Sequence, residues 1–418
     1  MGRPTLELSM IVKDGAATLE RCLRSAAAVV DRIVIGDTGS TDDSAAIARR
    51  YGAEVIAVPW EQDFAHARNV VLQHGQCDWA LVLDADEMLD GRAATAIEGL
   101  IARQTVAAYD IWRWNYVRES HIRSGDQAPK ANPGIVEASR PFPAYVLSLN
   151  TRLFRRHPEI YFEGCVHETV VGRLEKFRLP RAQASAFVIH HLGQGEDSTE
   201  TRQRKNELYQ ELGLKKLQAN PTDPRASYEL GLGELEHYRR PAEALQYFER
   251  ACELDPKFAP AWLYAGICLV RLNRLSEAKE RLSKARRLGP RTAVLEEAFG
   301  DACFHSGHYE QATHYYASAQ ALGCASALTK AKLGASEVCI GLVGQGLRRL
   351  EMAVASEPEF SELYDILVAA AVKGGKLALA AEAAEKRLTM GSPEEFHFQI
   401  AAELRARVGA NVQESYSL

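Results

Sequence analysis

The sequence predicts an α/β domain built on a parallel sheet, followed by an all-α domain of helical repeats. In the first half, short runs rich in Val, Ile and Leu alternate with stretches of helical spacing. After residue 195 such runs cease, and from Asp223 the sequence repeats with a period of 34 residues. The length of 418 residues exceeds one ordinary core and fits about two or three domains.

Four runs of the first half are expected to be buried strands, namely Leu8–Lys13, Arg32–Asp37, Glu54–Val58 and Trp79–Asp84. Helical spacing lies between them, in Ala17–Val30, Asp42–Tyr51 and Ala65–His74. This order predicts a parallel sheet with helices on both faces. Ligands of such sheets bind beyond the carboxyl ends of the strands. We therefore expect cofactor-binding residues among the polar side chains there, which include Lys13, Asp37 and Asp84.

Columns of small residues and prolines recur at the 34-residue step, which is the length of a tetratricopeptide unit. The clearest columns are Ala244, Ala278 and Ala312; Gly266, Gly300 and Gly334; and Pro256, Pro290 and Pro358. Small residues let the two helices of a hairpin approach closely, and proline ends the second helix. We expect five repeats over residues 223–392, stacked into a curved solenoid with a concave face.

The domain boundaries follow from these patterns. We expect the α/β domain in residues 1–195, a polar linker with a leading helix in 196–222, the repeats in 223–392, and a final helix and tail in 393–418. The run YDIWRWNYVRE alternates like a strand. The stretch after it, Arg118–Pro143, is rich in Gly, Pro, Ser and charge, and it predicts a long loop that closes over a site.

Composition excludes several classes of protein. Apolar residues make up 46% and charged residues 25%, as in globular proteins rather than disordered, collagen-like or disulfide-scaffold chains. The formal charge of −5 provides no general attraction for nucleic acid. The charged N-terminus predicts no secretory signal, and the absence of an 18-residue apolar run predicts no membrane span. Eight scattered cysteines without a CxxC pair predict a reducing, cytoplasmic location.

Three carboxylates follow the last of the expected strands. Asp84, Asp86 and Glu87 lie within four residues, and a cation would relieve their mutual repulsion. Oxygen ligands favour Mg²⁺ or Mn²⁺, which can also bridge a diphosphate. A solvated turn would need no metal, but the position directly after a buried strand favours the metal site.

Two further segments carry candidate nucleotide ligands. Asp37 lies at a strand tip between Gly36 and Gly39, where its carboxylate can accept the imide N–H of a uracil. The alternative for Asp37 is a role in the turn or as a helix cap. Arg68 lies at the head of a helix and can pair with a phosphate or a pyrimidine. The alternative for Arg68 is a surface ion pair.

Together these segments resemble the nucleotide-sugar domain of family 2 glycosyltransferases, which has the Rossmann-like GT-A fold. The similarity is carried by VKDG, VDRIVIGDTGSTDDS, PWEQDFAHARN and WALVLDADE, and it resumes at RLFRR, YFEGCVHE and IHHLG. The sequence is most similar to a bacterial branch in which tetratricopeptide repeats follow the GT-A domain. That branch includes peptide S- and O-glycosyltransferases of the glycocin (sublancin-type) pathway. Asp14–Gly15 departs from the Asn-Glu that relatives commonly show.

The resemblance implies a role for each matching residue. Asp37 would recognise the nucleobase, and Arg68 would stand near the nucleotide. Asp86 would be the principal metal ligand, and Asp84 would contact the ribose or the metal. The implied cofactors are Mn²⁺ or Mg²⁺ and a nucleotide-sugar donor, with a UDP-sugar favoured.

GT-A enzymes often take a further metal ligand from a histidine near the end of the domain. His191 matches the His-x-Gly of relatives, and His190 would then face the core. A purely structural role for either histidine remains the alternative.

The implied reaction is transfer of a sugar from a nucleoside diphosphate with inversion at the anomeric carbon. A metal would stabilise the leaving diphosphate, and a carboxylate would take the proton of the acceptor. We expect Glu168 of the VHE triplet to be this base, with His167 beside it, and Glu87 is the rival candidate.

The expected acceptor is a Ser, Thr or Cys side chain of a peptide or protein, bound with help from the repeats. The repeats are alternatively expected to pair two subunits as a homodimer. Two other functions remain open: transfer to a glycan or lipid-linked saccharide, and a scaffold whose transferase domain has lost activity. Intact Asp37 and Asp84-x-Asp86 argue against the scaffold.

Overall fold

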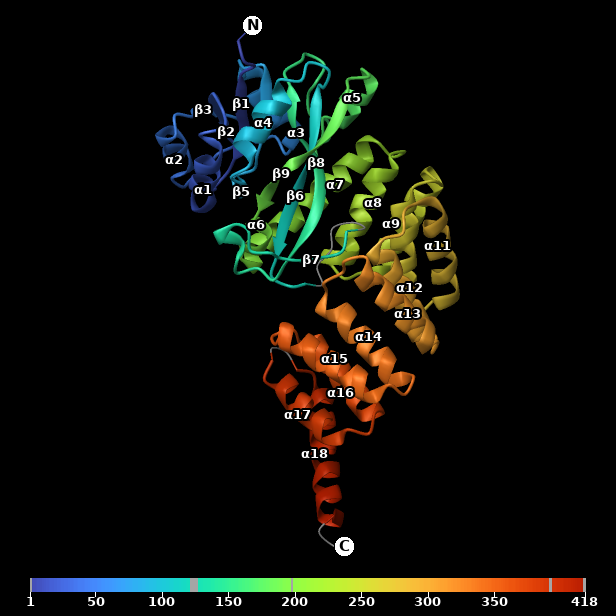
Figure 1. Ribbon diagram of the computed structural model, residues 1–418. Coiled ribbons are helices and arrows are strands. Elements are labelled where there is room, and N and C mark those ends of the chain that lie inside the picture. Colours follow the sequence, from blue (N-terminus) through green and yellow to red (C-terminus); the bar gives the residue numbers. More distant parts are fainter. Residues whose placement is uncertain (1, 121–126, 197, 391–392, 416–418) are drawn as a thin grey trace. The chain divides into compact units, whose positions relative to one another are not determined.

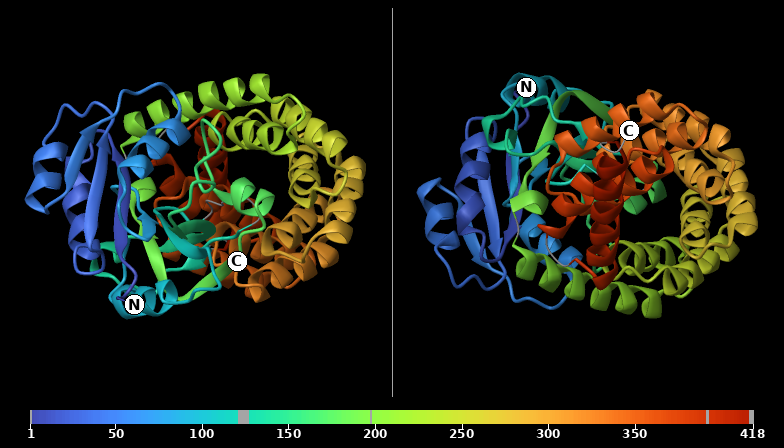
Figure 2. Two further views of the ribbon diagram at one scale, coloured as in Figure 1. Left: turned by 90° about the horizontal axis from the view of Figure 1, so that it is seen from above. Right: turned by 90° about the horizontal axis from the view of Figure 1, so that it is seen from below.

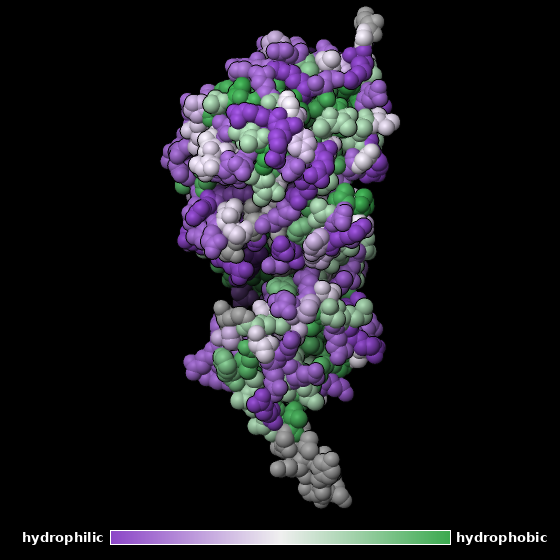
Figure 3. Space-filling view, turned by 90° about the vertical axis from the view of Figure 1, so that its left-hand side faces the viewer, coloured by the Kyte–Doolittle hydropathy of each residue, from purple (hydrophilic) through white to green (hydrophobic). Residues whose placement is uncertain are grey.

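The computed structural model describes residues 2–120, 127–196, 198–390 and 393–415 (Figure 1). The chain divides into two compact units. The first comprises residues 1–117 and 132–233, and the second comprises 118–131 and 234–418. Hydrophilic side chains predominate on the face drawn in Figure 3. None of the helices within the described ranges combines the length and the apolar character needed to cross a membrane.

The first unit is built on a mixed sheet. Its strands are β1 (Leu6–Val12), β2 (Arg32–Asp37), β3 (Glu54–Ala57), β4 (Trp79–Val82), β5 (Glu87–Leu89), β6 (Ala108–Val117), β8 (Ala144–Arg155) and β9 (Arg181–His191). Their spatial order is β3-β2-β1-β4-β8-β6-β9-β5. The pairs β1–β2, β2–β3 and β1–β4 are parallel, as predicted. β8 enters antiparallel beside β4, and the long strands β6 and β8 run side by side (Figure 1).

Helices cover both faces of the parallel strands. The helices of this unit are α1 (Ala16–Ala26), α2 (Ser44–Arg50), α3 (Phe64–His74), α4 (Ala93–Ile101), α5 (Val171–Lys176), α6 (Gly193–Glu196), α7 (Thr199–Ala219) and α8 (Pro224–Leu232), and η1 (Glu137–Ser139) is a single 3₁₀ turn. Leu23 of α1 and Ile97 of α4 pack in one core with Leu8. Val71 of α3 packs with Val34 in a separate cluster. The predicted α/β fold with helices on both sides is confirmed.

The second unit is helical apart from β7 (Lys130–Ala131). Its helices are α9 (Pro241–Leu254), α10 (Ala259–Arg271), α11 (Leu275–Leu288), α12 (Ala293–His305), α13 (Tyr309–Ala321), α14 (Ala327–Cys339), α15 (Val343–Ser356), α16 (Ser361–Lys373), α17 (Leu377–Leu388) and α18 (Glu395–Ser415), and a π-helical turn (Gly233–His237) precedes α9. Figure 2 shows these helices following one another along a curved array. The predicted all-α architecture of this part of the chain is confirmed.

The glycine column explains how the hairpins pack. A Cβ on Gly266 of α10 would lie 2.6 Å from Leu282 of α11. A Cβ on Gly300 of α12 would lie 2.6 Å from Tyr316 of α13. Contacts under 3 Å are excluded for real side chains, so only glycine lets these helices approach so closely.

Two expected boundaries differ from the structure. The first unit continues past residue 195 to Gly233, because α7 packs on it: Leu212 is fully buried and its carbonyl accepts a hydrogen bond from the Cys165 thiol. Residues 196–222 are therefore mostly a packed helix, and α8, the first repeat helix, also belongs to the first unit.

The expected loop 118–143 is divided between the units. Ser120 Oγ accepts a hydrogen bond from Ala327 N, and Pro129 O accepts one from Ala325 N, so this part packs on the repeats. Asn132, by contrast, donates to the carbonyls of Ser139 and Phe142 within the first unit. Residues 121–126 lie outside the described residues. The stretch is consequently tied to packed structure at both ends.

Candidate active site

The candidate site forms where β4 ends. The backbone turns after Val82, and Glu87 N donates a hydrogen bond to Asp84 O at 3.0 Å, which closes the turn that leads into β5. This turn presents Asp84, Asp86 and Glu87 at the carboxyl edge of the sheet, as the strand pattern predicted. The three carboxylates then face three different environments.

Glu87 is the buried structural member of the triplet. Its side chain is fully buried, and Oε1 accepts hydrogen bonds from Arg113 and Arg152, each at 3.0 Å. Oε2 accepts from Asp84 N at 2.9 Å. Both carboxylate oxygens are thus occupied, which a buried charge requires.

Asp84 is held by arginines. Oδ1 accepts from Arg68 at 2.6 Å and Oδ2 from Arg152 at 3.0 Å, while Arg113 lies 3.9 Å from Oδ2. Burial alone would raise the pKa of this carboxyl, but the charges of Arg152 and Arg68 outweigh burial and hold the pKa of Asp84 well below its ordinary value. Asp84 therefore stays ionised and is directed at guanidinium groups.

Arg68 bridges Asp84 and Glu168. Its Nε donates to Glu168 Oε1 at 2.5 Å, and its side chain is buried against the Phe162 ring. Desolvation opposes the charge on Arg68, but the Asp84 and Glu168 carboxylates raise its pKa. Arg68 Nη1 is buried without a hydrogen-bond partner in the described part of the chain. One strong donor therefore remains available to a ligand oxygen.

The loop that carries Glu168 is fixed from α3. Asn69 exchanges two hydrogen bonds with the backbone of Phe162, and Phe64 N donates to Cys165 O at 3.0 Å. His167 adopts a left-handed φ of 53°, which is unusual for a side-chain-bearing residue and occurs often at functional sites. These constraints place Glu168 Oε1 on Arg68, while Oε2 accepts no hydrogen bond from any described residue.

Asp86 and His191 form the opposite side of the site. His191 Nε2 lies 3.3 Å from Asp86 Oδ2, and β5 pairs with β9 so that His191 lies opposite Glu87. A Cβ on Gly193 would lie 1.8 Å from Asp86 Oδ2, so any larger residue there would have to displace the Asp86 carboxylate. Burial opposes the charge of Asp86, but the interaction with His191 outweighs it and lowers the pKa of Asp86.

Asn115 sets the tautomer of His191. The Asn115 amide nitrogen donates to Val146 O and Ser148 Oγ, which leaves Oδ1 as the acceptor facing His191 Nδ1 at 2.8 Å. Nδ1 must then carry a proton, so Nε2 donates to Asp86 when the ring is charged, and in the neutral ring the Nε2 lone pair faces the Asp86 carboxylate. His191 Nε2 and Asp86 Oδ2 are both electron-rich and lie 3.3 Å apart, so a proton or a cation between them would stabilise the pair.

These observations test whether a divalent cation fits. Asp86 and His191 offer an oxygen and a nitrogen ligand, and Asn115 provides the outer hydrogen bond typical of metal-bound histidine. Asp84 does not join them, because its oxygens are engaged by Arg68 and Arg152. Within the described residues no three potential ligands gather into a metal cluster. A cation here would need further oxygens from a ligand such as a diphosphate.

Three other expectations concern Asp37, Lys13 and His190. Asp37 Oδ1 accepts from Gly39 N and Ser40 N, so the alternative turn role is observed, while Oδ2 has no partner among the described residues. Lys13 is exposed at the end of β1. His190 is fully buried, as expected of a core residue, and it contacts Tyr116 Oη at 2.8 Å. Burial lowers the pKa of His190 to about 4.

Sequence reasoning missed several residues of the site. Arg113 and Arg152 come from β6 and β8, and their partners lie 26 to 68 residues away in the sequence, with no local signal. Tyr209 comes from α7, and its ring lies 6.0 Å from His167 and 6.2 Å from Phe64. Partial burial and then the charges of Asp84, Glu168 and Asp86 raise the pKa of Tyr209 to about 12.

Two family models match parts of this chain. Residues 9–158 match the model of the family described as Glycosyl transferase family 2. The first unit contains a family 2 glycosyltransferase domain. Residues 237–296 match a tetratricopeptide repeat model, which lies within the helical array. The matched ranges include Asp37, Arg68, Asp84 and Asp86, whereas His191 and α7 lie beyond the glycosyltransferase match.

Several curated proteins are similar to parts of this chain. A TPR repeat-containing protein of Synechococcus elongatus is 34% identical over 212 residues, covering 50% of this chain and 47% of its own. An uncharacterized glycosyltransferase of Rickettsia felis is 35% identical over 126 residues, covering 29% and 41%. The SPbeta prophage-derived glycosyltransferase SunS of Bacillus subtilis is 23% identical over 260 residues, covering 61% and 55%. The chain spans about half the length of these curated relatives.

Proposed function

We propose that this chain is an inverting glycosyltransferase that moves a sugar from a nucleoside diphosphate, with UDP favoured, to a Ser, Thr or Cys side chain of a peptide or protein. The carrying observation is the arrangement at the end of β4. There one turn presents both the Asp86–His191 pair and Asp84, the partner of Arg68, and Arg68 Nη1 is a buried donor without a partner in the described ranges. The family 2 match supports a sugar donor, and the similarity to SunS supports the peptide acceptor.

Asp86 and His191 are the residues that would hold Mn²⁺ or Mg²⁺. A bound cation of this kind supplies Lewis-acid stabilisation of charge on a departing diphosphate. Asn115 keeps the His191 lone pair directed at Asp86, and Gly193 leaves space for the Asp86 carboxylate. The free donor of Arg68 would contact a diphosphate oxygen through a charge-assisted hydrogen bond.

Asp37 and Lys13 would bind the rest of the nucleotide. The Asp37 carboxylate is fixed by two backbone N–H groups on Oδ1, and Oδ2 would accept the imide N–H of uracil. The exposed ammonium of Lys13, next along the edge of the sheet, would approach the phosphates. Asp84 acts through Arg68 and Arg152 rather than on the metal in this proposal.

Glu168 would take the proton of the acceptor. Its Oε2 accepts no hydrogen bond within the part of the chain that the structure describes, its side chain is largely buried, and the strained backbone of His167 fixes its direction. Glu87 suits this role poorly, because both of its oxygens already accept hydrogen bonds in full burial. Tyr209 lies on the same side as His167 and would form part of the acceptor wall.

The location and assembly are proposed on more general grounds. All eight cysteines are free thiols, which is compatible with a reducing, cytoplasmic compartment. The curved repeat array would bind the peptide or protein acceptor, or would pair two subunits as a homodimer.

The test is a panel of nucleotide sugars incubated with the full chain and acceptor peptides. Released nucleotide is measured with and without EDTA, and mass spectrometry shows whether the peptides gain the mass of a sugar. We expect the wild-type chain to release UDP, and EDTA to stop this release. The variant Asp86→Asn should abolish UDP release. The control Glu98→Gln, which changes an exposed carboxylate of α4, should leave it unchanged. Modified glycans without modified peptides would change the acceptor class. No donor binding at all would favour the scaffold.

A further inference from the structure

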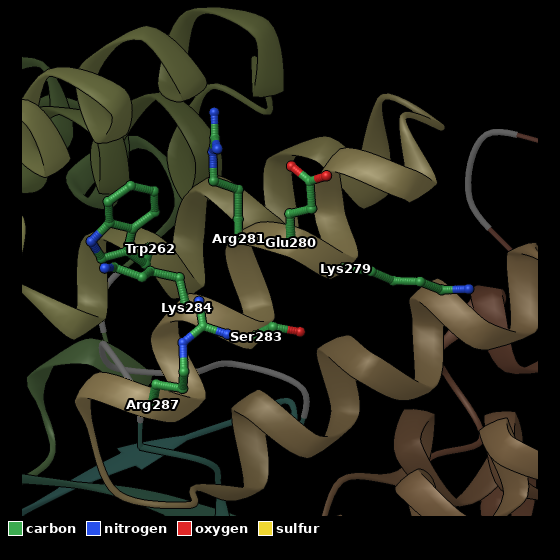
Figure 4. Close-up of a pocket in the computed structure, with 7 residues that line it drawn as sticks. All are labelled: Trp262, Lys279, Glu280, Arg281, Ser283, Lys284 and Arg287. Atoms are coloured by element: carbon green, nitrogen blue, oxygen red, sulfur yellow. The ribbon is translucent and has the colours of Figure 1, made fainter.

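A basic hollow lies on the hairpin of α10 and α11 (Figure 4). Its volume is about 600 Å³, and it is lined by Trp262, Lys279, Glu280, Arg281, Ser283, Lys284 and Arg287. Four of these seven residues are cationic and one is acidic, in a chain whose formal charge is −5. We call this feature the Trp262 hollow.

The aromatic ring itself has a structural reason to be there. Trp262 Nε1 donates to Pro256 O at 3.1 Å. Three repeats later, at the same 34-residue register, Tyr364 Oη donates to Pro358 O at 3.2 Å. An aromatic donor at this column therefore fixes the turn that precedes the first helix of a repeat. The ring alone indicates no ligand.

The repeat architecture does not require the cations around the ring. At the register of Lys284, two repeats carry Arg250 and Lys386, but the two repeats that directly follow carry Ser318 and Met352. At the register of Arg287, they carry Ala321 and Ala355. Because the fold accepts neutral residues at both positions, packing does not explain why the second repeat has cations there.

These cations are poorly compensated by the protein. Arg281 Cζ lies 5.5 Å and Lys284 Nζ 5.8 Å from the centroid of the Trp262 ring. Arg281 pairs with Glu249 at 3.3 Å, but its Nε is buried without a hydrogen-bond partner in the described part of the chain. Lys284 and Arg287 have no carboxylate within ion-pair distance among the described residues. An anionic ligand would satisfy all three.

We infer that the Trp262 hollow binds an acidic stretch of a polypeptide. Carboxylate side chains match the positive lining, and they pair in bidentate fashion with guanidinium groups. A nucleobase fits less well, because it is neutral and would leave the charges of Arg281 and Lys284 beside the indole ring uncompensated. An open hollow between neighbouring helices suits an extended peptide that lays several carboxylates along α11. The inference concerns binding alone and holds whether or not the first unit transfers a sugar.

The test is fluorescence anisotropy with the full chain and a short labelled peptide of alternating Glu and Gly. The same peptide with Gln in place of Glu is the ligand control. The variant Lys284→Glu with Arg287→Glu replaces two of the four cations of the lining by carboxylates. The control variant, Arg348→Glu with Lys386→Glu, reverses the same number of exposed charges on α15 and α17, where Lys386 occupies the Lys284 register. Circular dichroism melting confirms that both variants fold.

We expect the Glu peptide to bind more tightly than the Gln peptide, and binding to weaken with salt. Charge reversal in the hollow should weaken the Glu peptide by about tenfold or more, whereas the control variant should change binding by about twofold at most. Equal binding of the two peptides would overturn the inference. Equal loss in both variants would also overturn it, as would preferential binding of UDP or an oligonucleotide at Lys284 and Arg287.

Discussion

Replacing Arg68 by methionine should destabilise the first unit strongly. Arg68 is 7% exposed and is the shared partner of Asp84 and Glu168, at 2.6 Å and 2.5 Å. Methionine fills a similar volume but leaves both carboxylates short of a partner. Breaking a buried ion pair from one side costs about 3–5 kcal/mol. For a domain of about 200 residues this corresponds to a fall in Tm of roughly 10 °C.

Differential scanning calorimetry of the full chain measures this loss. Arg3→Met is the matched control, because it removes an ion pair with Asp31 in which the Arg3 side chain is 60% exposed. Such surface pairs contribute about 0–1 kcal/mol, so the control should lower Tm by about 2 °C at most. The double variant Arg68→Met with Glu168→Gln should recover part of the loss, because one uncompensated charge is removed with its partner.

The reasoning would be refuted by a small effect of Arg68→Met. A fall in Tm no larger than that of Arg3→Met would mean that the two carboxylates find water or other donors. A lower Tm for the double variant than for Arg68→Met would show that the charge of Glu168 does not destabilise the fold when Arg68 is absent. Either result would remove Arg68 as the brace of the site.

Three further predictions concern other residues. Gly193→Ala should weaken binding of UDP with Mn²⁺ by calorimetry, because the added Cβ would lie 1.8 Å from Asp86 Oδ2; Gly99→Ala, where a Cβ meets nothing within 4 Å, should bind normally. Glu168→Gln should lower turnover by about 10²–10⁴-fold while leaving the donor Kd unchanged, and a matching loss of donor binding would contradict its role as base. Burial opposes the charge of Glu296, but hydrogen bonds from Arg291 and Ser318 lower the pKa of its carboxyl. The wild type should therefore have a higher Tm than Arg291→Gln at pH 6, and this difference in Tm should shrink toward pH 3 as Glu296 is protonated. A difference in Tm that does not change with pH would refute that pairing.

The parallel half of the sheet could be predicted because local pattern and fold agree there. β2 spans Arg32–Asp37 as expected, since its apolar residues are buried on both faces and polar residues bound it. β8 and β9 gave weaker signals. β9 has mostly partly or fully exposed residues along its first half, so its sequence lacks a continuous apolar run. Strands that depend on partners far along the chain are poorly marked in their own residues.

The site divides in the same way. Asp84 and Asp86 were found because they directly follow a buried strand, and this position is visible in the sequence. Arg113 and Arg152 were missed, because an arginine in a strand does not indicate which distant carboxylate it meets. The same limit made residues 196–222 look like a polar linker with a leading helix, whereas Leu212 packs this helix, α7, onto the first unit.

The pairing of Asp86 with His191 is the central claim, and isothermal titration of UDP in the presence of Mn²⁺ tests it most directly. We expect the wild-type chain to bind UDP only with the metal, and Asp86→Ala and His191→Ala each to lose that metal-dependent binding while Glu98→Gln retains it. Unchanged, metal-independent binding of UDP in both variants would contradict the account.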